Sequence, residues 1–195
     1  MRVAGVLLAV LGCVTCAVLV RFSTPTEGSH RLFGADVCAP TATINCDYVL
    51  SSGWAKIGPI PTATLGLAYF WAVGMWYLLV GPPNYRGRWW HLLPLVTVSL
   101  GFCGSLGFMY LLVFRLPVWC TWCVAAHIVN VFLFVLTLLG WPRRPAALPE
   151  PGPAVTAYPS HPRAGMVVSA ITAMLLMIVL GSAFYQSQAM AWKMS

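Results

Sequence analysis

Five apolar stretches that contain no charged residue constrain this chain more than any other feature. They cover residues 3–20, 62–80, 91–114, 119–140 and 166–185, and each is 18 to 24 residues long. All 15 Asp, Glu, Lys and Arg residues fall outside them. At about 1.5 Å of rise per residue, helices of these lengths cross the roughly 30 Å core of a bilayer. We therefore predict an all-α, multi-pass integral protein of the lipid bilayer.

The composition excludes two other classes of protein. Of the 195 residues, 59% are apolar and only 8% are charged, whereas soluble domains carry about 25% charged residues and disordered chains have low hydrophobicity. The net charge of +7 does not indicate nucleic-acid binding, because the Lys and Arg residues occur singly or in pairs. A protein that follows a phosphate backbone needs them clustered.

The basic residues also predict an orientation. With the amino terminus in the cytoplasm, six of the eleven Lys and Arg residues are cytoplasmic: Arg2, Arg86, Arg88, Arg143, Arg144 and Arg163. Three of the other five lie in or beside the long segment 21–61, and long segments cross membranes largely regardless of charge. We expect a cytoplasmic amino terminus and a carboxyl terminus on the outer face.

The first stretch has a second interpretation, as a cleaved signal peptide or lipoprotein leader. Arg2 precedes an apolar run, and residues 10–13 faintly resemble a lipoprotein cleavage box. The run is longer than a usual signal-peptide core, and residues 22–25 offer no cleavage site between small residues. A retained anchor is the preferred interpretation, and in either case the segment that follows is exported.

The segment 21–61 contains a predicted short helix that carries Cys46 at its amino end. Asn45 suits the N-cap and Gly53 suits the stop after the helix. Apolar and aromatic side chains in this region favour a position at the membrane surface. They are Tyr48, Leu50, Trp54 and Ile57.

A second segment, 141–165, contains seven prolines, which lack the backbone donor of helices and sheets. It predicts an extended cytoplasmic linker. The expected organisation is a four-helix catalytic unit at 1–140, this linker, a fifth transmembrane helix at 166–185 and a short tail at 186–195.

The seven cysteines fall into two groups by depth. Cys38 and Cys46 lie in the outer segment, and Cys120 and Cys123 form a Cys-x-x-Cys motif at the outer start of the fourth stretch. All four are therefore on the side where disulfides form. The others lie within the stretches and are interpreted as packing residues: Cys13, Cys16 and Cys103.

The position of the Cys-x-x-Cys motif at a helix start favours redox chemistry. Unpaired backbone N–H groups and the helix dipole stabilise a thiolate in the first turn, and the thiolate is the nucleophile in thiol–disulfide exchange. A second cysteine pair in a nearby loop, such as Cys38 and Cys46, would allow two electrons to pass between the pairs.

His127 and Asn130 continue the face of the fourth helix that begins with Cys120 and Cys123. Polar residues within a membrane span are costly and usually face a cavity or the bundle interior. With Trp119 and Trp122 beside it, this face predicts a pocket for a membrane-soluble aromatic electron acceptor, a quinone.

Less specific interpretations remain open at this stage. Cys38 and Cys46 could form a static disulfide, and Cys120 and Cys123 could form a structural bridge. A metal site with His127 would lack a fourth ligand, so no metal is expected. Haem attachment is disfavoured, because Val124 stands where a Cys-x-x-Cys-His motif needs histidine.

Three runs together resemble the vitamin K epoxide reductase family, and its bacterial members more than its vertebrate ones. They are Asn-Cys-Asp-Tyr-Val-Leu-Ser-Ser-Gly-Trp-Ala-Lys at 45–56, Ile-Pro-Thr-Ala-Thr-Leu-Gly-Leu at 60–67 and Cys-Thr-Trp-Cys at 120–123. The resemblance covers roughly residues 5–140. It implies a four-helix transmembrane bundle around a quinone of the menaquinone, ubiquinone or vitamin K type, with a fifth transmembrane helix beside it.

The resemblance also implies roles for the four cysteines. Cys123 would face the quinone, Cys120 would exchange with Cys46, and Cys38 would meet a thioredoxin-fold partner. Many bacterial relatives carry a thioredoxin-like domain after the fifth helix, and none follows here, so the partner is expected to be a separate protein.

The residues predicted to contact the quinone are Ser52, Thr62, His127 and Asn130, of which Asn130 rests on the helix face described above and the others also on the resemblance. Ser52 matches a family serine near the active site. Thr62 stands where vertebrate members have an Asn that contacts the quinone, and His127 stands where they have a Tyr. These differences argue against assuming the vertebrate substrate.

The function predicted from the sequence is a membrane thiol–disulfide oxidoreductase that oxidises a thioredoxin-fold protein and reduces a quinone, which supports disulfide formation. The expected location is a bacterial inner membrane, with the active site on its outer face. One alternative is a thiol-dependent reductase of vitamin K epoxide or quinone. An alternative of another class is a non-catalytic membrane scaffold with structural disulfides.

Overall fold

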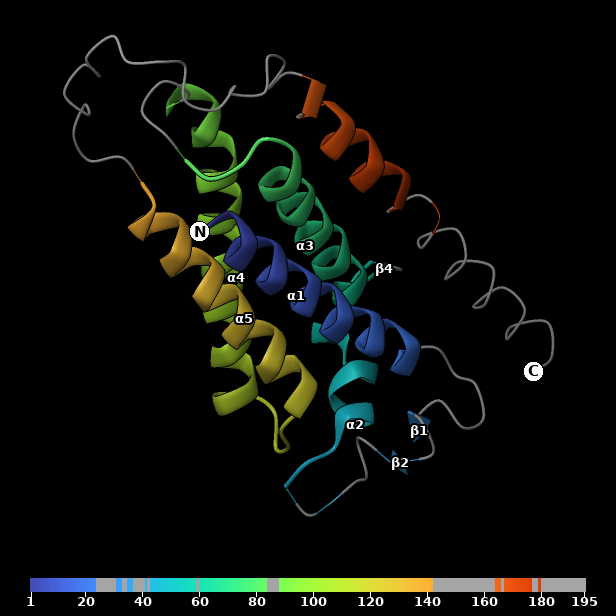
Figure 1. Ribbon diagram of the computed structural model, residues 1–195. Helices are drawn as coiled ribbons and strands as arrows, with labels where there is room; N and C mark the ends of the chain where they lie inside the picture. Colours follow the sequence, from blue (N-terminus) through green and yellow to red (C-terminus); the bar gives the residue numbers. More distant parts are fainter. Residues whose placement is uncertain are drawn as a thin grey trace, which may run out of the picture.

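Four long apolar helices dominate the computed structural model, which describes residues 1–23, 31–32, 35–36, 41, 43–58, 60–83, 88–141, 164–165, 167–176 and 179. They are α1 (Arg2–Phe22), α3 (Thr62–Leu79), α4 (Arg88–Phe114) and α5 (Thr121–Leu139), shown in Figure 1. All four are long and apolar enough to cross a membrane. The prediction of an all-α integral membrane protein is confirmed, and the four predicted spans end within three residues of these helices.

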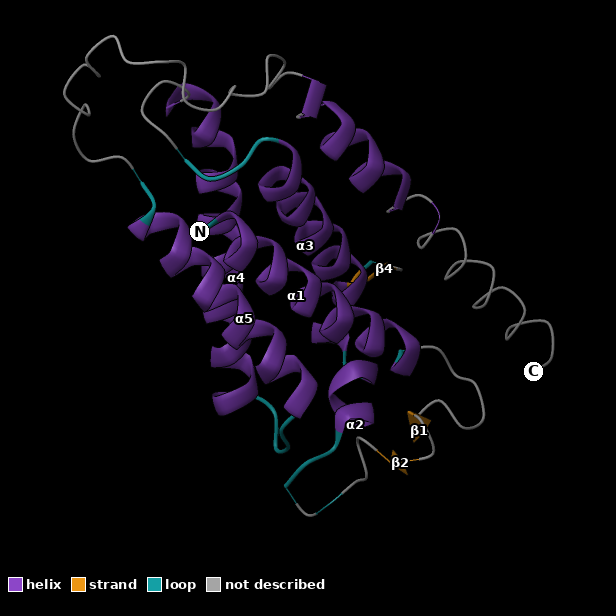
Figure 2. Cartoon of the chain, viewed as in Figure 1, coloured by secondary structure: helices purple, strands orange, loops and turns teal. Residues whose placement is uncertain are grey.

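Short elements connect α1 to α3 (Figure 2). They are β1 (Arg31–Leu32), β2 (Ala35–Asp36), α2 (Cys46–Ser51), the 3₁₀ turn η1 (Gly53–Ala55), β3 (Lys56–Ile57) and β4 (Ile60–Pro61). The strands form two antiparallel hairpins, in which Arg31 pairs with Asp36 and Lys56 pairs with Pro61. Gly58 has a φ of 61° in the second hairpin, a conformation that glycine adopts without steric cost.

The predicted short helix is present as α2. Asn45 is its N-cap, and Oδ1 of Asn45 accepts a hydrogen bond of 3.0 Å from the backbone N–H of Tyr48. The helix ends before Gly53, as predicted, although Gly53 begins the η1 turn and does not adopt the left-handed conformation. Leu50 was expected at the membrane surface and is instead buried, whereas Trp54 and Ile57 are exposed.

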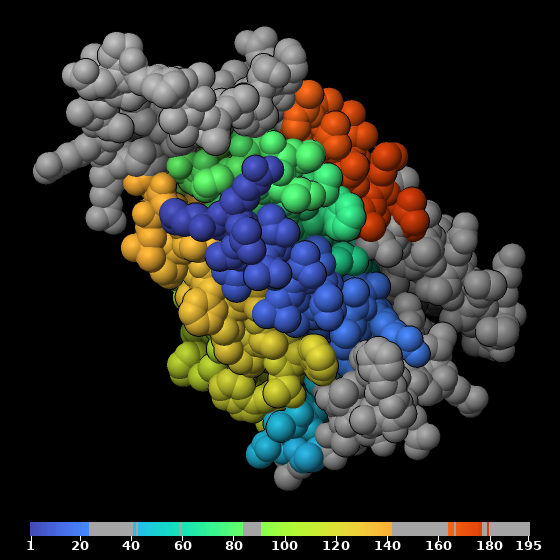
Figure 3. Space-filling view, viewed as in Figure 1, coloured from blue at the N-terminus to red at the C-terminus, as the bar shows by residue number. Residues whose placement is uncertain are grey.

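The long helices alternate in direction, so that one end of the bundle collects the end of α1, the start of α3, the end of α4 and the start of α5 (Figure 1). In Figure 3, α2 lies at this end, next to the start of α5. Near the carboxyl ends of α3 and α5, at the opposite end of the bundle, the hydroxyls of Tyr77 and Thr137 form a buried hydrogen bond of 2.9 Å. Val98 and Leu133 are fully buried in the same bundle.

Small residues allow α1 to approach α3 closely. A methyl group added at Gly12 would lie 2.5 Å from Cε1 of Phe70, and one added at Gly5 would lie 2.5 Å from Cδ1 of Tyr77. Membrane helices lack a hydrophobic driving force for association and depend on such close packing. The two glycines therefore set the distance between α1 and α3.

The fifth transmembrane helix remains a prediction. The described part contains an apolar helix, Val167–Leu176, which is too short to span a bilayer. A methyl group added at Gly165, just before this helix, would lie 3.2 Å from Cβ of Leu79 in α3. Most of the predicted linker, residues 142–163, and the predicted tail at 186–195 lie outside the described residues.

We predict that Gly12→Ala destabilises the bundle by roughly 1–3 kcal/mol, the usual cost of overpacking a tight interface. Gly107→Ala is the matched control, because a methyl group at Gly107 in α4 would meet nothing within 4 Å. Thermal unfolding of both variants in detergent measures the difference. Equal melting temperatures would contradict a close-packed contact between α1 and α3.

Candidate redox site

Cys120 and Cys123 form a disulfide at the amino end of α5. Cys120 is the N-cap, and its Sγ accepts a hydrogen bond of 3.2 Å from the backbone N–H of Cys123. Cys120 is fully buried, whereas Cys123 is half-buried. The open N–H groups of this first turn stabilise a thiolate when the disulfide is reduced.

Two backbone hydrogen bonds join the segment before α2 to the residue before this motif. The N–H of Asn45 donates to the carbonyl of Trp119 at 3.0 Å, and the N–H of Trp119 donates to the carbonyl of Thr43 at 2.8 Å. Ile44 and Trp119 thus form a parallel bridge. Cys46 follows Asn45 and Cys120 follows Trp119, so the bridge brings the backbones of both cysteines together.

Cys46 shares a buried cluster with Cys120, and it is 1% exposed. Cys46 is itself disulfide-bonded, and its partner is neither Cys120 nor Cys123, because those two are bonded to each other. Cys38, the predicted partner, lies outside the described residues. The pairing of Cys38 with Cys46 therefore remains a prediction.

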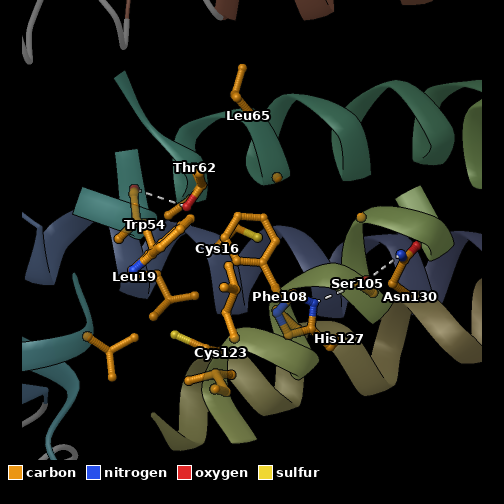
Figure 4. Close-up of a pocket in the computed structure, with 18 of the residues that line it drawn as sticks. Cys16, Leu19, Trp54, Thr62, Leu65, Ser105, Phe108, Cys123, His127 and Asn130 are labelled. Carbon is orange, nitrogen blue, oxygen red and sulfur yellow. Dashed lines mark hydrogen bonds between the residues drawn. The ribbon is translucent and has the colours of Figure 1, made fainter. Parts of the chain in front are cut away.

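A cavity of about 420 Å³ opens among the four long helices and the segment from α2 to β3. Its wall is mostly apolar, and Cys123 lies on it, whereas Cys120 does not. All four residues predicted to contact a quinone line it: Ser52, Thr62, His127 and Asn130. Figure 4 shows Thr62, Cys123 and His127 around the shared space. Trp119 and Trp122, the tryptophans beside the cysteine pair in the sequence, are not among its lining residues, whereas Trp54 is.

The hydroxyl protons of Ser52 and Thr62 are used within the fold. Ser52 donates a hydrogen bond of 2.6 Å to the carbonyl of Val49, and Thr62 donates one of 3.0 Å to the carbonyl of Ala55. Each hydroxyl has a single proton. Towards the cavity, both residues can therefore accept hydrogen bonds or pack, but neither can donate without losing its backbone partner.

A chain of polar side chains crosses the cavity wall from α3 to α5 and α4. The hydroxyl of Tyr69 donates to Oδ1 of Asn130 at 2.5 Å, and Nδ2 of Asn130 donates to Oγ of Ser105 at 2.8 Å. Oγ of Ser105 lies 3.1 Å from Nδ1 of His127. The His127 ring stacks on Phe108, with ring centroids 5.8 Å apart and planes 18° apart.

Among the residues that line the cavity and carry a thiol or a hydroxyl, Cys16, Tyr69 and Ser105 were not predicted as site residues. Polar side chains within a membrane span are costly, which is the reasoning that identified His127 and Asn130. Applied to the second and third spans, the same reasoning would have selected Tyr69 and Ser105. Cys16, interpreted as a packing residue, is a free thiol that is buried in the bundle and lines the cavity.

A metal centre receives no support from the described residues. They contain no group of three His, Cys, Asp or Glu side chains that could hold a metal ion. Cys120 and Cys123, the two sulfur ligands that such a site would use, are bonded to each other.

Comparison with protein families agrees with this geometry. The model of the vitamin K epoxide reductase family matches residues 3–138, which is more than half of the chain. The matched region includes the four long helices almost to the end of α5, and also both parts of the redox site. The chain therefore belongs to the vitamin K epoxide reductase family, a family of membrane oxidoreductases.

Proposed function

We propose that the protein oxidises a separate thioredoxin-fold partner and passes two electrons to a membrane quinone, of the menaquinone, ubiquinone or vitamin K type. Cys46, with Cys38, would accept the electrons from the partner, and Cys120 with Cys123 would deliver them to the quinone. The proposed location is a bacterial inner membrane with a cytoplasmic amino terminus. The redox end of the bundle would then face outward, where the protein supports disulfide formation.

One observation carries this proposal: the Cys120–Cys123 disulfide lies between the segment of Cys46 and the cavity. On one side, the bridge at Trp119 holds the segment of Cys46 against the start of α5. On the other side, Cys123 lies on the wall of the cavity. A structural disulfide needs neither of these, whereas an electron relay needs both.

The cavity suits a small aromatic acceptor. Binding pockets for small molecules usually measure about 300–1,000 Å³ and combine apolar walls with a few polar groups. This cavity has a volume of about 420 Å³, and its polar side chains come from only a few positions. Four membrane-length helices surround it, so a lipid-soluble acceptor would reach it from the bilayer.

The electrons and protons balance along the proposed route. A dithiol of the partner becomes a disulfide as it reduces the disulfide of Cys46. The Cys46 thiolate then attacks Sγ of Cys120, forms a Cys46–Cys120 disulfide and releases Cys123 as a thiolate. The second thiol of the Cys46 pair, proposed to be Cys38, attacks Sγ of Cys46, which re-forms the outer disulfide and releases Cys120 as a thiolate. The quinone takes up the two electrons together with two protons and leaves as quinol, and the Cys120–Cys123 disulfide re-forms.

Burial explains why two cysteine pairs are needed. Cys120 has an exposed fraction of 0%, so a folded partner cannot reach its sulfur directly. Cys46 is 1% exposed, so the first exchange with the partner would fall to Cys38, and Cys46 would pass the electrons on to Cys120. Because Cys46 and Cys120 share one buried cluster, exchange between them would carry electrons inward without opening the bundle.

The cysteine series is the principal test. In liposomes that contain quinone, we predict that Cys123→Ala and Cys120→Ala lose at least 100-fold in quinone-dependent oxidation of a reduced thioredoxin-fold protein, because no disulfide remains beside the cavity. Cys103→Ala is the matched control, since Cys103 is a free, exposed thiol of α4. Quinone absorbance and thiol titration measure both half-reactions.

Two outcomes of this series would contradict the proposal. Unchanged activity in Cys123→Ala would show that electrons do not pass through Cys123. If the purified protein also contained no quinone, the result would favour the non-catalytic membrane scaffold. Quinone-independent reduction of vitamin K epoxide by thiols, measured directly, would favour the epoxide reductase.

Cys46→Ala distinguishes the contribution of the outer cysteine pair from that of Cys120 and Cys123. We predict that it loses oxidation of the protein partner by at least tenfold but retains oxidation of a small dithiol, which can reach Cys123 through the cavity. Parallel rate measurements with dithiothreitol and with the protein partner test this. Equal losses for both donors would argue against an inward relay through Cys46.

Thr62→Val and His127→Phe test which of these two residues donates a hydrogen bond to the quinone. Because the Thr62 proton is bound to the Ala55 carbonyl, we predict a quinone KM within about threefold of the wild-type value. For His127→Phe, which removes a hydrogen bond of about 1 kcal/mol, we predict a roughly fivefold rise. Steady-state titrations with quinone measure both, and a larger rise in Thr62→Val would reverse the two roles.

A further inference from the structure

We infer that Tyr69, Asn130 and Ser105 act as positioning residues that fix the tautomer of His127, so that its Nε2–H is the hydrogen-bond donor to a carbonyl oxygen of the quinone. The inference rests on the proposed function. It assigns roles to Tyr69 and Ser105, which the sequence did not single out, and it moves Asn130 from a quinone contact to a support of His127.

The chain of hydrogen bonds has a direction. Tyr69 donates to the carbonyl oxygen of Asn130, which leaves the amide nitrogen of Asn130 to donate to Ser105. Asn130 is 4% exposed, so its two polar ends are both satisfied inside the protein. A side chain held in this way cannot turn towards a ligand without breaking two buried hydrogen bonds.

The hydrogen bond from Asn130 to Ser105 determines how Ser105 interacts with His127. Its Oγ already accepts a hydrogen bond from Asn130, and its one proton needs an acceptor because Ser105 is only 6% exposed. Within the described part of the chain, the acceptor in reach is Nδ1 of His127, at 3.1 Å. A proton on Nδ1 would leave the buried Ser105 proton without an acceptor, which is costly. The proton of neutral His127 therefore lies on Nε2.

Nε2 is then the ring nitrogen available to a ligand. Nδ1 is occupied by Ser105, and no residue that the structure describes forms a hydrogen bond with Nε2. His127 lines the cavity, and the stack on Phe108 fixes the plane of its ring. Figure 4 shows the dashed contacts that link His127, Ser105 and Asn130 on one side of the cavity.

A fixed donor at this position suits the reduction of a quinone. A carbonyl oxygen accepts a hydrogen bond in the oxidised molecule and gains negative charge as electrons arrive. A preorganised N–H therefore stabilises the transition state more than the bound quinone. The opposite tautomer would point a lone pair at that oxygen and repel the same charge.

Nitrogen-15 NMR of the protein labelled at histidine tests the tautomer without any quinone turnover. The chain has four histidines, and the signal missing from His127→Gln identifies His127. We expect the wild-type pattern of a protonated Nε2 and an unprotonated Nδ1. Ser105→Ala should shift His127 to a mixture of tautomers, and Ser105→Thr should restore the wild-type pattern. A wild-type proton on Nδ1 would overturn the inference.

Kinetics provide the second readout. Ser105→Ala should lower kcat for quinone reduction about tenfold, with KM changed less than threefold, and Ser105→Thr should recover most of the loss. Tyr69→Phe, which keeps the ring in place, should lower kcat in the same direction by about threefold. Ser99→Ala is the matched control, because Ser99 of α4 donates to the Leu95 carbonyl at 2.7 Å and does not line the cavity.

The two readouts separate the inference from the proposed function. A correct tautomer in a wild-type protein that reduces no quinone would refute the proposed function alone. Wild-type activity with unchanged kcat in Ser105→Ala would refute the positioning role alone. A fall in kcat that Ser105→Thr does not rescue would also count against it, because it would indicate packing and not hydrogen bonding.

Discussion

The parallel bridge between Ile44 and Trp119 is the contact on which the rest of the site depends. Two backbone hydrogen bonds, of 2.8 and 3.0 Å, hold the segment before Cys46 against the residue before Cys120. Backbone bonds of this kind are independent of the redox state of either cysteine. The backbones of the two cysteines can therefore stay adjacent while the sulfurs are oxidised and reduced.

The bilayer imposes the second constraint, since polar groups within it must find partners in the protein. Glycines bring α1 close to α3, and the cavity opens where the four helices and the α2 segment meet. Tyr69, Asn130 and Ser105 satisfy one another across α3, α5 and α4. The hydrogen bonds that satisfy these polar groups inside the membrane also hold His127 at the cavity.

The sequence predicted those features that depend on local chemistry or on span length. The four spans, the Asn45 cap and the cysteine pair at the start of α5 follow from charge, capping and motif. The inward position of Leu50 and the contact from Tyr69 to Asn130 depend on how separate helices face one another. The sequence of a helix that is apolar on every side does not show which side faces the neighbouring helices. These contacts could therefore be identified only from the three-dimensional structure.

A relay from Cys46 to Cys120 is tested most directly by mapping disulfides in the Cys123→Ala protein. Cys120 has lost its partner in this variant, and the relay predicts that the Cys120 thiolate attacks the disulfide of Cys46, releases the partner of Cys46 as a thiolate and forms a Cys46–Cys120 disulfide. After brief reduction and reoxidation, with free thiols alkylated, mass spectrometry should find a peptide that joins Cys46 to Cys120. Recovery of Cys120 as an alkylated free thiol, with Cys46 back in its original disulfide, would contradict the relay.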